Sequence, residues 1–200
     1  MNGFERRKQK KIEQIYSIAF RLFSEHGFQK VSVNEIAQQA RVSPATIYNY
    51  FGTKEQLYVD MLMNWMDKQL ERYDCILDSP LSFPEKTKEI MLLEAQNLKL
   101  LSDEFLNVPS SESTGLAERM ERDSGEKVMR FFMKFVAMGK QEGYIHREQT
   151  EEVAIRYFTM FKNELGRYWQ AGDQEGLTQS MDQFIELFFY GLIGQAKKQK

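Results

Sequence analysis

Apolar residues recur at intervals of three and four along most of the chain, and no segment alternates apolar and polar residues as a half-buried strand would. The first such stretch runs from about Glu5 to His26 and keeps its other face polar. Gly27 stands where a helix commonly ends in a left-handed residue, and Phe28 is placed to fold back on Phe23 as in a Schellman motif. The pattern predicts an all-α fold that opens with a long amphipathic helix.

Signals for helix starts follow in quick succession. Ser32 is a candidate N-cap that forms a capping box with Glu35, and Ser43 precedes Pro44, a residue favoured in the first helical turn. Thr53 begins another capping box, which opens a longer helix through about residue 77. We therefore expect two short helices, the second starting at Pro44, and then a long one.

Turn-forming residues divide the rest of the chain. Proline, serine and glycine mark the breaks, and the segment 108–115 is the predicted flexible loop. The helices predicted between these breaks lie at about 84–107, 116–122, 125–141, 149–170 and 177–197.

Composition limits the class of protein. With 42% hydrophobic residues in 200 positions, the chain can bury one sizeable core, or a small module joined to a larger one. Charged residues interrupt the longest apolar stretches before they reach the roughly 18 residues of a membrane span. Cys75 is the single cysteine, and no apolar export signal follows the basic N-terminus, so we expect a reducing, cytoplasmic location. His26 and His146 lack zinc spacing, and we expect neither a metal nor a cofactor.

The net charge of −2 conceals a difference between the two ends of the chain. Residues 1–56 hold nine basic and five acidic side chains, a net charge of +4, and the remainder holds 18 basic and 24 acidic ones, a net charge of −6. Such asymmetry is expected of a small N-terminal domain that binds a polyanion and is joined to a larger acidic domain. A charged stretch is more often only a solvated surface, so this feature needs independent support.

The two short helices have the spacing of a DNA-binding helix-turn-helix. On the second one, Ile47 and Phe51 share a face and are predicted to dock on the preceding helices. The opposite face carries Ala45, Thr46 and Asn49, whose small or hydrogen-bonding groups suit base edges and phosphates. We interpret this segment as the recognition helix. The alternative is an ordinary helical hairpin that packs on the rest of the protein and does not bind DNA.

Two further segments are candidate phosphate contacts. Lys54 lies at a predicted helix N-terminus, where free N–H groups and the helix dipole also favour an anion. The basic side chains between Arg6 and Lys11 form a predicted arm suited to backbone or minor-groove contacts.

The run from Ala19 to Leu57, AFRLFSEHGFQKVSVNEIAQQARVSPATIYNYFGTKEQL, resembles the tetracycline-repressor (TetR) family of bacterial regulators. It matches the family's F-x-x-x-G-[FY] helix end, its T/S-[TV]-x-x-I-A and A-x-V-S-x-[GA]-T-[LI]-Y-x-[YH]-F segments, and the K-x-x-L that follows them. The resemblance covers only this part of the chain. It implies DNA contacts at Asn34, Ser43, Pro44, Ala45, Thr46, Tyr48, Asn49, Tyr50 and Lys54.

Two positions depart from the family pattern. Arg41 stands in the turn where many members have glycine, so we expect either mild backbone strain at a positive φ or an added phosphate contact from its side chain. Pro44 lacks a side-chain donor at a position that often reads bases. The operator sequence of a relative therefore does not transfer to this chain.

The resemblance also implies an organisation and a function. It predicts a helix-turn-helix DNA-binding domain at 1–53, which contains three helices, and a larger helical-bundle domain at 54–200 for effector binding and dimerisation. The implied function is a ligand-responsive homodimeric repressor that binds a pseudo-palindromic operator and is released by a small, largely apolar effector.

Candidate residues in the larger domain rest on weaker patterns. Polar Asn97 interrupts an apolar helical face, and methionine adapts to varied apolar ligands, although each such residue taken singly is more simply a core position. The candidate effector residues are Trp65, Asn97, Leu101, Met129, Met133 and Phe161. The last two predicted helices carry more apolar residues than one buried face needs, which indicates a subunit interface or a wide core helix. The candidate interface residues are Phe158, Leu165, Trp169, Met181, Phe184, Phe188 and Leu192.

Two other classes of protein fit less well. An enzyme would show a catalytic pattern, and the sequence has no Ser/His/Asp arrangement, Gly-rich phosphate loop, metal cluster or carboxylate pair at motif spacing. A non-specific architectural DNA binder is expected to have a basic body, whereas residues after position 56 are net acidic.

Overall fold

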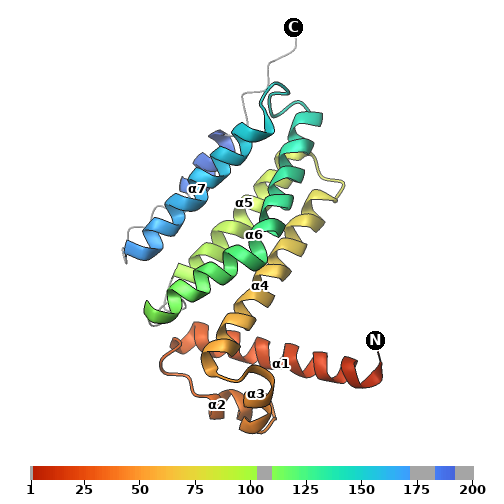
Figure 1. Ribbon diagram of the computed structural model, residues 1–200. Coiled ribbons are helices and arrows are strands. Elements are labelled where there is room, and N and C mark those ends of the chain that lie inside the picture. Colours follow the sequence, from red (N-terminus) through yellow and green to blue (C-terminus); the bar gives the residue numbers. More distant parts are fainter. Residues whose placement is uncertain (1, 103–109, 172–182, 192–200) are drawn as a thin grey trace. The chain divides into compact units, whose positions relative to one another are not determined.

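Helices form the regular structure of the described part of the chain. The computed structural model describes residues 2–102, 110–171 and 183–191, with the backbone alone at 98–102, 110–121, 123 and 165–171. Its helices are α1 (Gly3–His26), α2 (Val33–Gln39), α3 (Pro44–Phe51), α4 (Lys54–Leu77), α5 (Phe83–Ser102), α6 (Ser110–Gln141) and α7 (Glu151–Ala171), and residues 183–191 are also helical (Figure 1). The all-α class predicted from the sequence is confirmed. Within these ranges no helix is long and apolar enough to cross a lipid bilayer.

The chain divides into two compact units. The first joins residues 1–69 with 103–124, and the second joins 70–102 with 125–200, so the division falls inside α4 and inside α6. The predicted functional boundary after residue 53 lies within the first unit. Assignment of 1–53 to DNA binding and of 54–200 to effector binding and dimerisation stays a prediction.

Aromatic rings from α1, the following turn and α4 build the core of the first unit. The ring centroid of Phe23 lies 5.5 Å from that of Phe28 and 5.3 Å from that of Tyr58. The rings of Phe28 and Tyr58 are 5.1 Å apart, and all three side chains are buried. Tilted and edge-to-face contacts of this kind add to the gain from burying apolar area. Burial also raises the pKa of Tyr58, so its hydroxyl stays neutral.

Capping side chains set the starts of α2 and α4, as the sequence predicts. The Ser32 Oγ accepts a hydrogen bond from the N–H of Glu35 at 3.1 Å. The Thr53 Oγ1 accepts one from the N–H of Gln56 at 3.0 Å. Both bonds satisfy N–H groups that have no partner inside the helix.

The two ends of α1 are fixed by local bonds. Gly27 has φ 78° and ψ 155°, a conformation open almost only to glycine, and its N–H donates to the Phe23 carbonyl at 2.9 Å. At the other end, Asn2 Oδ1 accepts from the N–H of Glu5 at 2.9 Å, and the Glu5 carboxylate accepts from the N–H of Asn2 at 3.1 Å. This capping box starts α1 two residues before the predicted position. The basic residues from Arg6 to Lys11 lie within the first turns of α1, as the predicted helix from about Glu5 implies.

Two predicted breaks in the second half of the chain are wrong. α6 runs without interruption from Ser110 to Gln141, through 110–115 of the predicted loop and through the gap predicted between 116–122 and 125–141. Serine and glycine in a helix interior cost only about 0.5–1 kcal/mol each relative to alanine, so a long helix can include them. The rest of the predicted loop, at 108–109, lies outside the described residues, as does the end of the helix predicted to reach 107.

The second unit is centred on packed aromatic side chains. The ring centroid of Phe135 in α6 lies 4.8 Å from that of Phe83 and 5.5 Å from that of Phe189. The ring of Phe188 lies 4.4 Å from that of Phe161 and 5.1 Å from that of Phe189. These contacts join α5, α6, α7 and residues 183–191 in one hydrophobic core.

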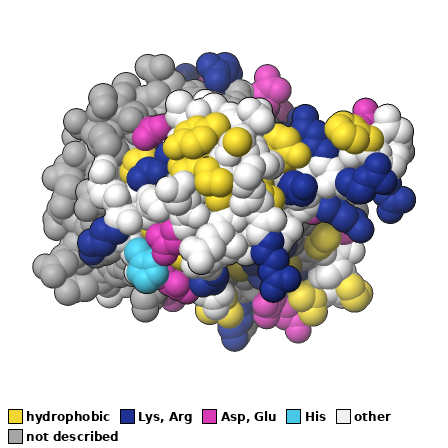
Figure 2. All heavy atoms as spheres, turned by 90° about the horizontal axis from the view of Figure 1, so that it is seen from below, with side chains coloured by type: hydrophobic (Ala, Val, Ile, Leu, Met, Phe, Trp, Pro, Cys, Tyr) yellow, Lys and Arg dark blue, Asp and Glu magenta, His cyan; other side chains and the backbone are white. Residues whose placement is uncertain are grey.

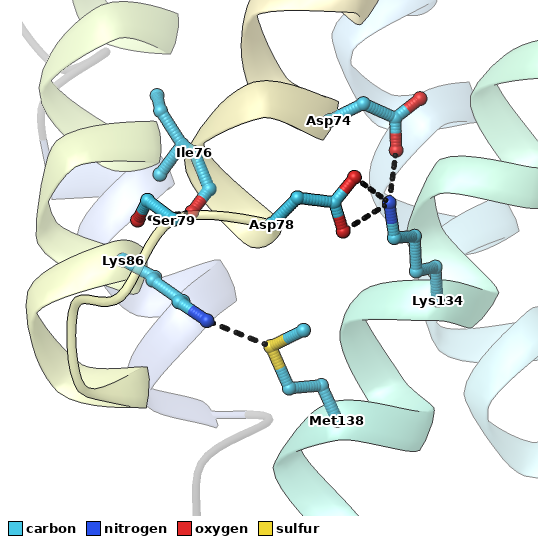
Figure 3. Close-up of polar contacts among 7 residues, drawn as sticks. All are labelled: Asp74, Ile76, Asp78, Ser79, Lys86, Lys134 and Met138. Atoms are coloured by element: carbon cyan, nitrogen blue, oxygen red, sulfur yellow. Dashed lines mark hydrogen bonds and ion pairs between the residues drawn. The ribbon is translucent and has the colours of Figure 1, made fainter.

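Polar contacts link α6 with the C-terminal end of α4 and with α5 (Figure 3). The Nζ of Lys134 lies 3.0 Å from Asp74 Oδ1 and 2.9 Å from Asp78 Oδ1, and its hydrogen bond to Asp78 is the main reason that its pKa is raised. Because these groups are partly exposed, the network contributes about 1 kcal/mol or less per pair. Lys86 of α5 is buried, and its Nζ donates to the thioether sulfur of Met138 at 3.6 Å.

Candidate DNA-binding site

A tight turn sets α3 directly after α2. Arg41 has φ 52°, its N–H donates to the Gln38 carbonyl at 3.2 Å, and the Val42 N–H donates to the Ala37 carbonyl at 3.0 Å. This pair of bonds is the Schellman pattern. A side chain other than glycine in that region costs roughly 1–2 kcal/mol. Of the two alternatives raised by the sequence, the positive φ is observed, and a phosphate contact from Arg41 stays a prediction.

The two faces of α3 differ, as the helical period predicts. Ile47 and Phe51 are buried, and the Phe51 ring centroid lies 5.5 Å from that of Tyr16 in α1. The exposed residues of the helix are Pro44, Ala45, Tyr48 and Asn49. Tyr48 keeps 51% of its surface exposed, which leaves a large ring with a hydroxyl free for base edges or sugars. α3 is thus anchored on one side and open on the other.

Ser43 and Thr46, both predicted DNA contacts, form the N-terminal cap of α3 together, with Ser43 as the capping residue. The Ser43 Oγ accepts from the N–H of Thr46 at 3.2 Å and shares a hydrogen bond with Thr46 Oγ1 at 2.9 Å. A hydroxyl can take part in more than one hydrogen bond, so contacts from both residues to DNA stay predictions. Asn34, in the first turn of α2, is exposed.

Lys54 lies where the sequence places it, but its ammonium is bonded inside the unit. The Nζ donates to the carbonyls of Phe28 at 2.8 Å and Val31 at 3.0 Å, and it lies 4.2 Å from the centroid of the Phe28 ring. The sequence did not reveal this role in holding the turn between α1 and α2. The phosphate contact expected of Lys54 stays a prediction.

A basic surface of α1 lies beside α3. Lys8 Nζ is 5.7 Å from the centroid of the Tyr50 ring, close enough for a cation–π contact. The other basic side chains of this helical segment are exposed, and they are Arg6, Arg7, Lys10 and Lys11. Figure 2, a view from below Figure 1, shows Lys and Arg side chains gathered on the projecting end of α1. This segment adds positive charge beside α3.

The candidate effector residues do not all fall in one unit. Trp65 belongs to the first unit, where its ring stacks on Phe20 with centroids 5.8 Å apart. In the second unit, Asn97 is buried and its Nδ2 donates to the Tyr73 hydroxyl at 2.7 Å. The candidates Met129, Met133 and Phe161 are partly buried against the core of that unit, and the side chain of Leu101 lies outside the described residues.

Tyr73 and Glu94 are polar residues of the second unit that the sequence analysis missed. The Tyr73 hydroxyl, on α4, donates to the Glu94 carboxylate, on α5. Burial raises the pKa of Glu94. The signal was present in the sequence, because Glu94 follows Ile90 by four residues and precedes Asn97 by three, on one helical face.

The described candidate interface residues lie largely inside the protomer. Phe188 is buried in the core, and Phe158 stacks on Phe132 with centroids 4.7 Å apart. Phe184 is half-buried. Helical periodicity cannot distinguish a core face from an interface face, so the pattern identified apolar positions without showing what covers them. The side chains of Leu165 and Trp169, together with Met181 and Leu192, lie outside the described residues.

Among the described side chains, no three of His, Cys, Asp and Glu come together as metal ligands would. α3 has one exposed face and one buried face and lies beside a basic helix, which is the arrangement that a helix-turn-helix DNA-binding protein requires.

Comparisons with known proteins agree with this class. Residues 15–61 match the family described as "Bacterial regulatory proteins, tetR family". The HTH-type transcriptional repressor KstR2 of Mycobacterium tuberculosis is 19% identical over 186 residues, which cover 90% of this chain and 91% of the relative. The fold is similar to that of the Bacillus subtilis regulator FadR in complex with stearoyl-CoA, with a TM-score of 0.58, 22% identity, and coverage of 90% of this chain and 98% of that one. It is also similar to a transcriptional regulator of Saccharomonospora viridis in complex with choline, with a TM-score of 0.60, 16% identity, and coverage of 94% and 100%.

The chain is a DNA-binding transcriptional regulator and not an enzyme. Residues 15–61 match the DNA-binding segment of the TetR family, so the resemblance drawn from this part of the sequence is confirmed.

Proposed function

We propose that this regulator is a homodimeric repressor that binds a pseudo-palindromic operator and is released by a small effector. The observation that carries the proposal is the open side of α3, where Tyr48 and Asn49 are exposed while Ile47 is buried. The basic segment of α1 beside Tyr50 supplies charge for the DNA backbone. Repression is favoured because KstR2, a relative along most of the chain, is named a repressor.

The dimer is supported by exposed apolar side chains on two joined helices. Met160 of α7 is 69% exposed, and Leu187 and Tyr190 in residues 183–191 are 68% and 62% exposed. The Tyr157 hydroxyl donates to the Phe188 carbonyl at 2.8 Å, which ties α7 to that segment. Large exposed apolar groups mark interaction surfaces, and twofold symmetry lets one surface pair with itself.

A dimer also explains how so small a DNA-binding unit achieves specificity. Twofold operators present half-sites about 34–36 Å apart on one face of the duplex, and two recognition helices double the base contacts. Sedimentation of the purified protein at micromolar concentration tests the proposal, because a monomer would contradict it.

Effector binding is supported by the chemistry of the second unit and by the neighbouring structures. Partly buried methionines, among them Met129 and Met133, pack around its core, and such side chains adapt to varied apolar ligands. Two proteins of similar fold are known with stearoyl-CoA and with choline, respectively. α4 begins at Lys54 in the first unit and continues into the second, so a shift of this helix on ligand binding would reach the DNA-binding helices.

A competition experiment tests DNA binding, and a titration tests the switch. Genomic fragments that the protein retains are sequenced, and affinity for the recovered site is compared with affinity for random DNA over a range of salt concentrations. Equal affinity for both would favour a non-specific architectural binder. Compounds that raise the melting temperature of the protein are then titrated into it with and without the operator. A coupling free energy of about 1–3 kcal/mol between the two sites means that the operator weakens ligand binding, and the ligand weakens operator binding, by about 5–150-fold. Equal ligand affinities in the two titrations would contradict release by the effector.

A further inference from the structure

A chain of hydrogen bonds in the second unit ends on one carboxylate. The Asn97 Nδ2 donates to the Tyr73 hydroxyl oxygen at 2.7 Å, and the Tyr73 hydroxyl donates in turn to Glu94. Tyr73 and Asn97 are buried, whereas Glu94 keeps part of its surface accessible. The two buried groups therefore hold the Glu94 carboxyl in a fixed position, while part of the surface of the residue stays accessible.

Tyr73, the partner of this carboxyl, belongs to the apolar and aromatic core of the unit. The Tyr73 ring centroid lies 5.3 Å from that of Phe131 in α6. Leu70 and Met91 are partly buried against the same core. None of the ion pairs among the described residues includes Glu94, although protein atoms remove most of its contact with water. A desolvated carboxylate is unfavourable until a cation pairs with it.

We propose that Glu94 binds the positively charged nitrogen of a small organic cation whose apolar body packs on the neighbouring side chains. This inference rests on the proposed function, and it names the chemical class of the effector. The Glu94 carboxylate supplies the opposite charge, and the rings of Tyr73 and Phe131 are groups that attract cations through their faces. Methionine and leucine side chains packed against the same core can adapt to an alkyl or ring body. An anionic ligand of the same size would meet like charge at Glu94.

Binding of a cation changes the protonation of this site. Burial raises the pKa of free Glu94, and an adjacent cation lowers it again, so binding releases protons from the carboxyl. Affinity for the cation then rises with pH while the free carboxyl titrates and levels off above its pKa. Burial and the neighbouring Glu94 raise the pKa of Tyr73 so that it stays neutral, and Arg72 opposes this only in part. On α6, Lys134 is paired with Asp74 and Asp78, so of these side chains Glu94 is the one whose proton the cation displaces.

Calorimetric titration with three probes of equal chain length tests the charge requirement. The probes are decyltrimethylammonium, decanol and decanoate, titrated below their micelle concentrations into the full-length protein. We expect the cation to bind more tightly than the alcohol and the anion. Glu94→Gln should weaken the cation by about tenfold or more, as for a desolvated charge pair. Glu89→Gln, at an exposed position of the same helix, is the matched control and should bind as the unchanged protein does.

Proton release gives a readout that does not depend on a variant. Titrations in buffers of different ionisation enthalpy should show release of protons as the cation binds, and Tyr73→Phe should weaken binding with smaller effect than Glu94→Gln. Three results would overturn the inference. The cation could bind Glu94→Gln as tightly as the unchanged protein, or decanoate could bind more tightly than the cation. The cation could also bind without releasing protons at a pH where free Glu94 is protonated. DNA binding is measured alongside. Intact operator binding with no preference for the cation overturns this inference alone, whereas absence of operator binding overturns the proposed function.

Discussion

Lys54→Met removes an ammonium that is bonded to the turn after α1 and keeps most of the apolar stem. Two hydrogen bonds, to the carbonyls of Phe28 and Val31, are lost together with the contact to the Phe28 ring. A hydrogen bond to a charged group contributes about 1.5–3 kcal/mol, and a cation–π contact about 0.5–2 kcal/mol. Lys54 is only partly buried and water replaces part of what is lost, so we expect a decrease of about 2–3 kcal/mol in the free energy of unfolding.

Urea unfolding followed by circular dichroism measures this loss, and a thermal scan should show a fall of roughly 2–4 °C per kcal/mol for a chain of this size. Lys30→Met is the matched control, because Lys30 lies in the same turn and is exposed. Equal unfolding free energies for the two variants would refute the structural role of Lys54.

The same variant tests the phosphate contact expected from the sequence. Loss of one phosphate contact reduces the magnitude of the slope of log K against log[salt] by about 0.9. We expect this reduction for Lys54→Met relative to the unchanged protein. The slope is measured at a temperature where the variant is folded. An unchanged slope would assign Lys54 wholly to the turn.

Three further changes test other parts of the molecule. Tyr48→Ala should weaken binding to the recovered operator by about 1–3 kcal/mol, as for a lost base contact, without lowering the melting temperature; fluorescence anisotropy and a thermal scan measure the two effects. Gly139→Ala places a Cβ 2.6 Å from the Ile145 Cδ1 and 2.7 Å from the Phe83 Cζ, and we expect urea unfolding to show a loss of about 1–2 kcal/mol after the helical preference for alanine is subtracted. Leu187→Glu should yield a folded monomer in sedimentation, since this side chain is exposed in the protomer. A dimer as stable as the unchanged one would show that Leu187 lies outside the interface.

Features that depend on neighbouring residues in the sequence were predictable. The caps at Ser32, Ser43 and Thr53 act within three residues, and the structure confirms each of them. The opposite faces of α3 follow from its period alone, as buried Ile47 and exposed Tyr48 show. For the same reason the all-helical class could be predicted.

Features that join distant segments were not predictable from periodicity. Lys54 bonds to carbonyls more than twenty residues earlier in the chain, and Tyr73 meets Glu94 only after α4 and α5 pack together. The sequence shows that Phe188 is apolar, but it does not show whether the residue packs in the core of its own protomer or against a partner. In the structure it is buried in the core of its own protomer. The serine and glycine residues near 110–125 have only a weak preference for a turn, and here they lie inside α6.

The most direct test is the ratio between specific and non-specific DNA affinity. The purified protein is titrated with its recovered operator and with a shuffled duplex of equal length at physiological salt, by fluorescence anisotropy. A regulator that reads bases through α3 should bind the operator about 10³-fold or more tightly, and Tyr48→Ala should reduce that ratio. Equal affinity for the two duplexes would contradict sequence-specific recognition by this helix.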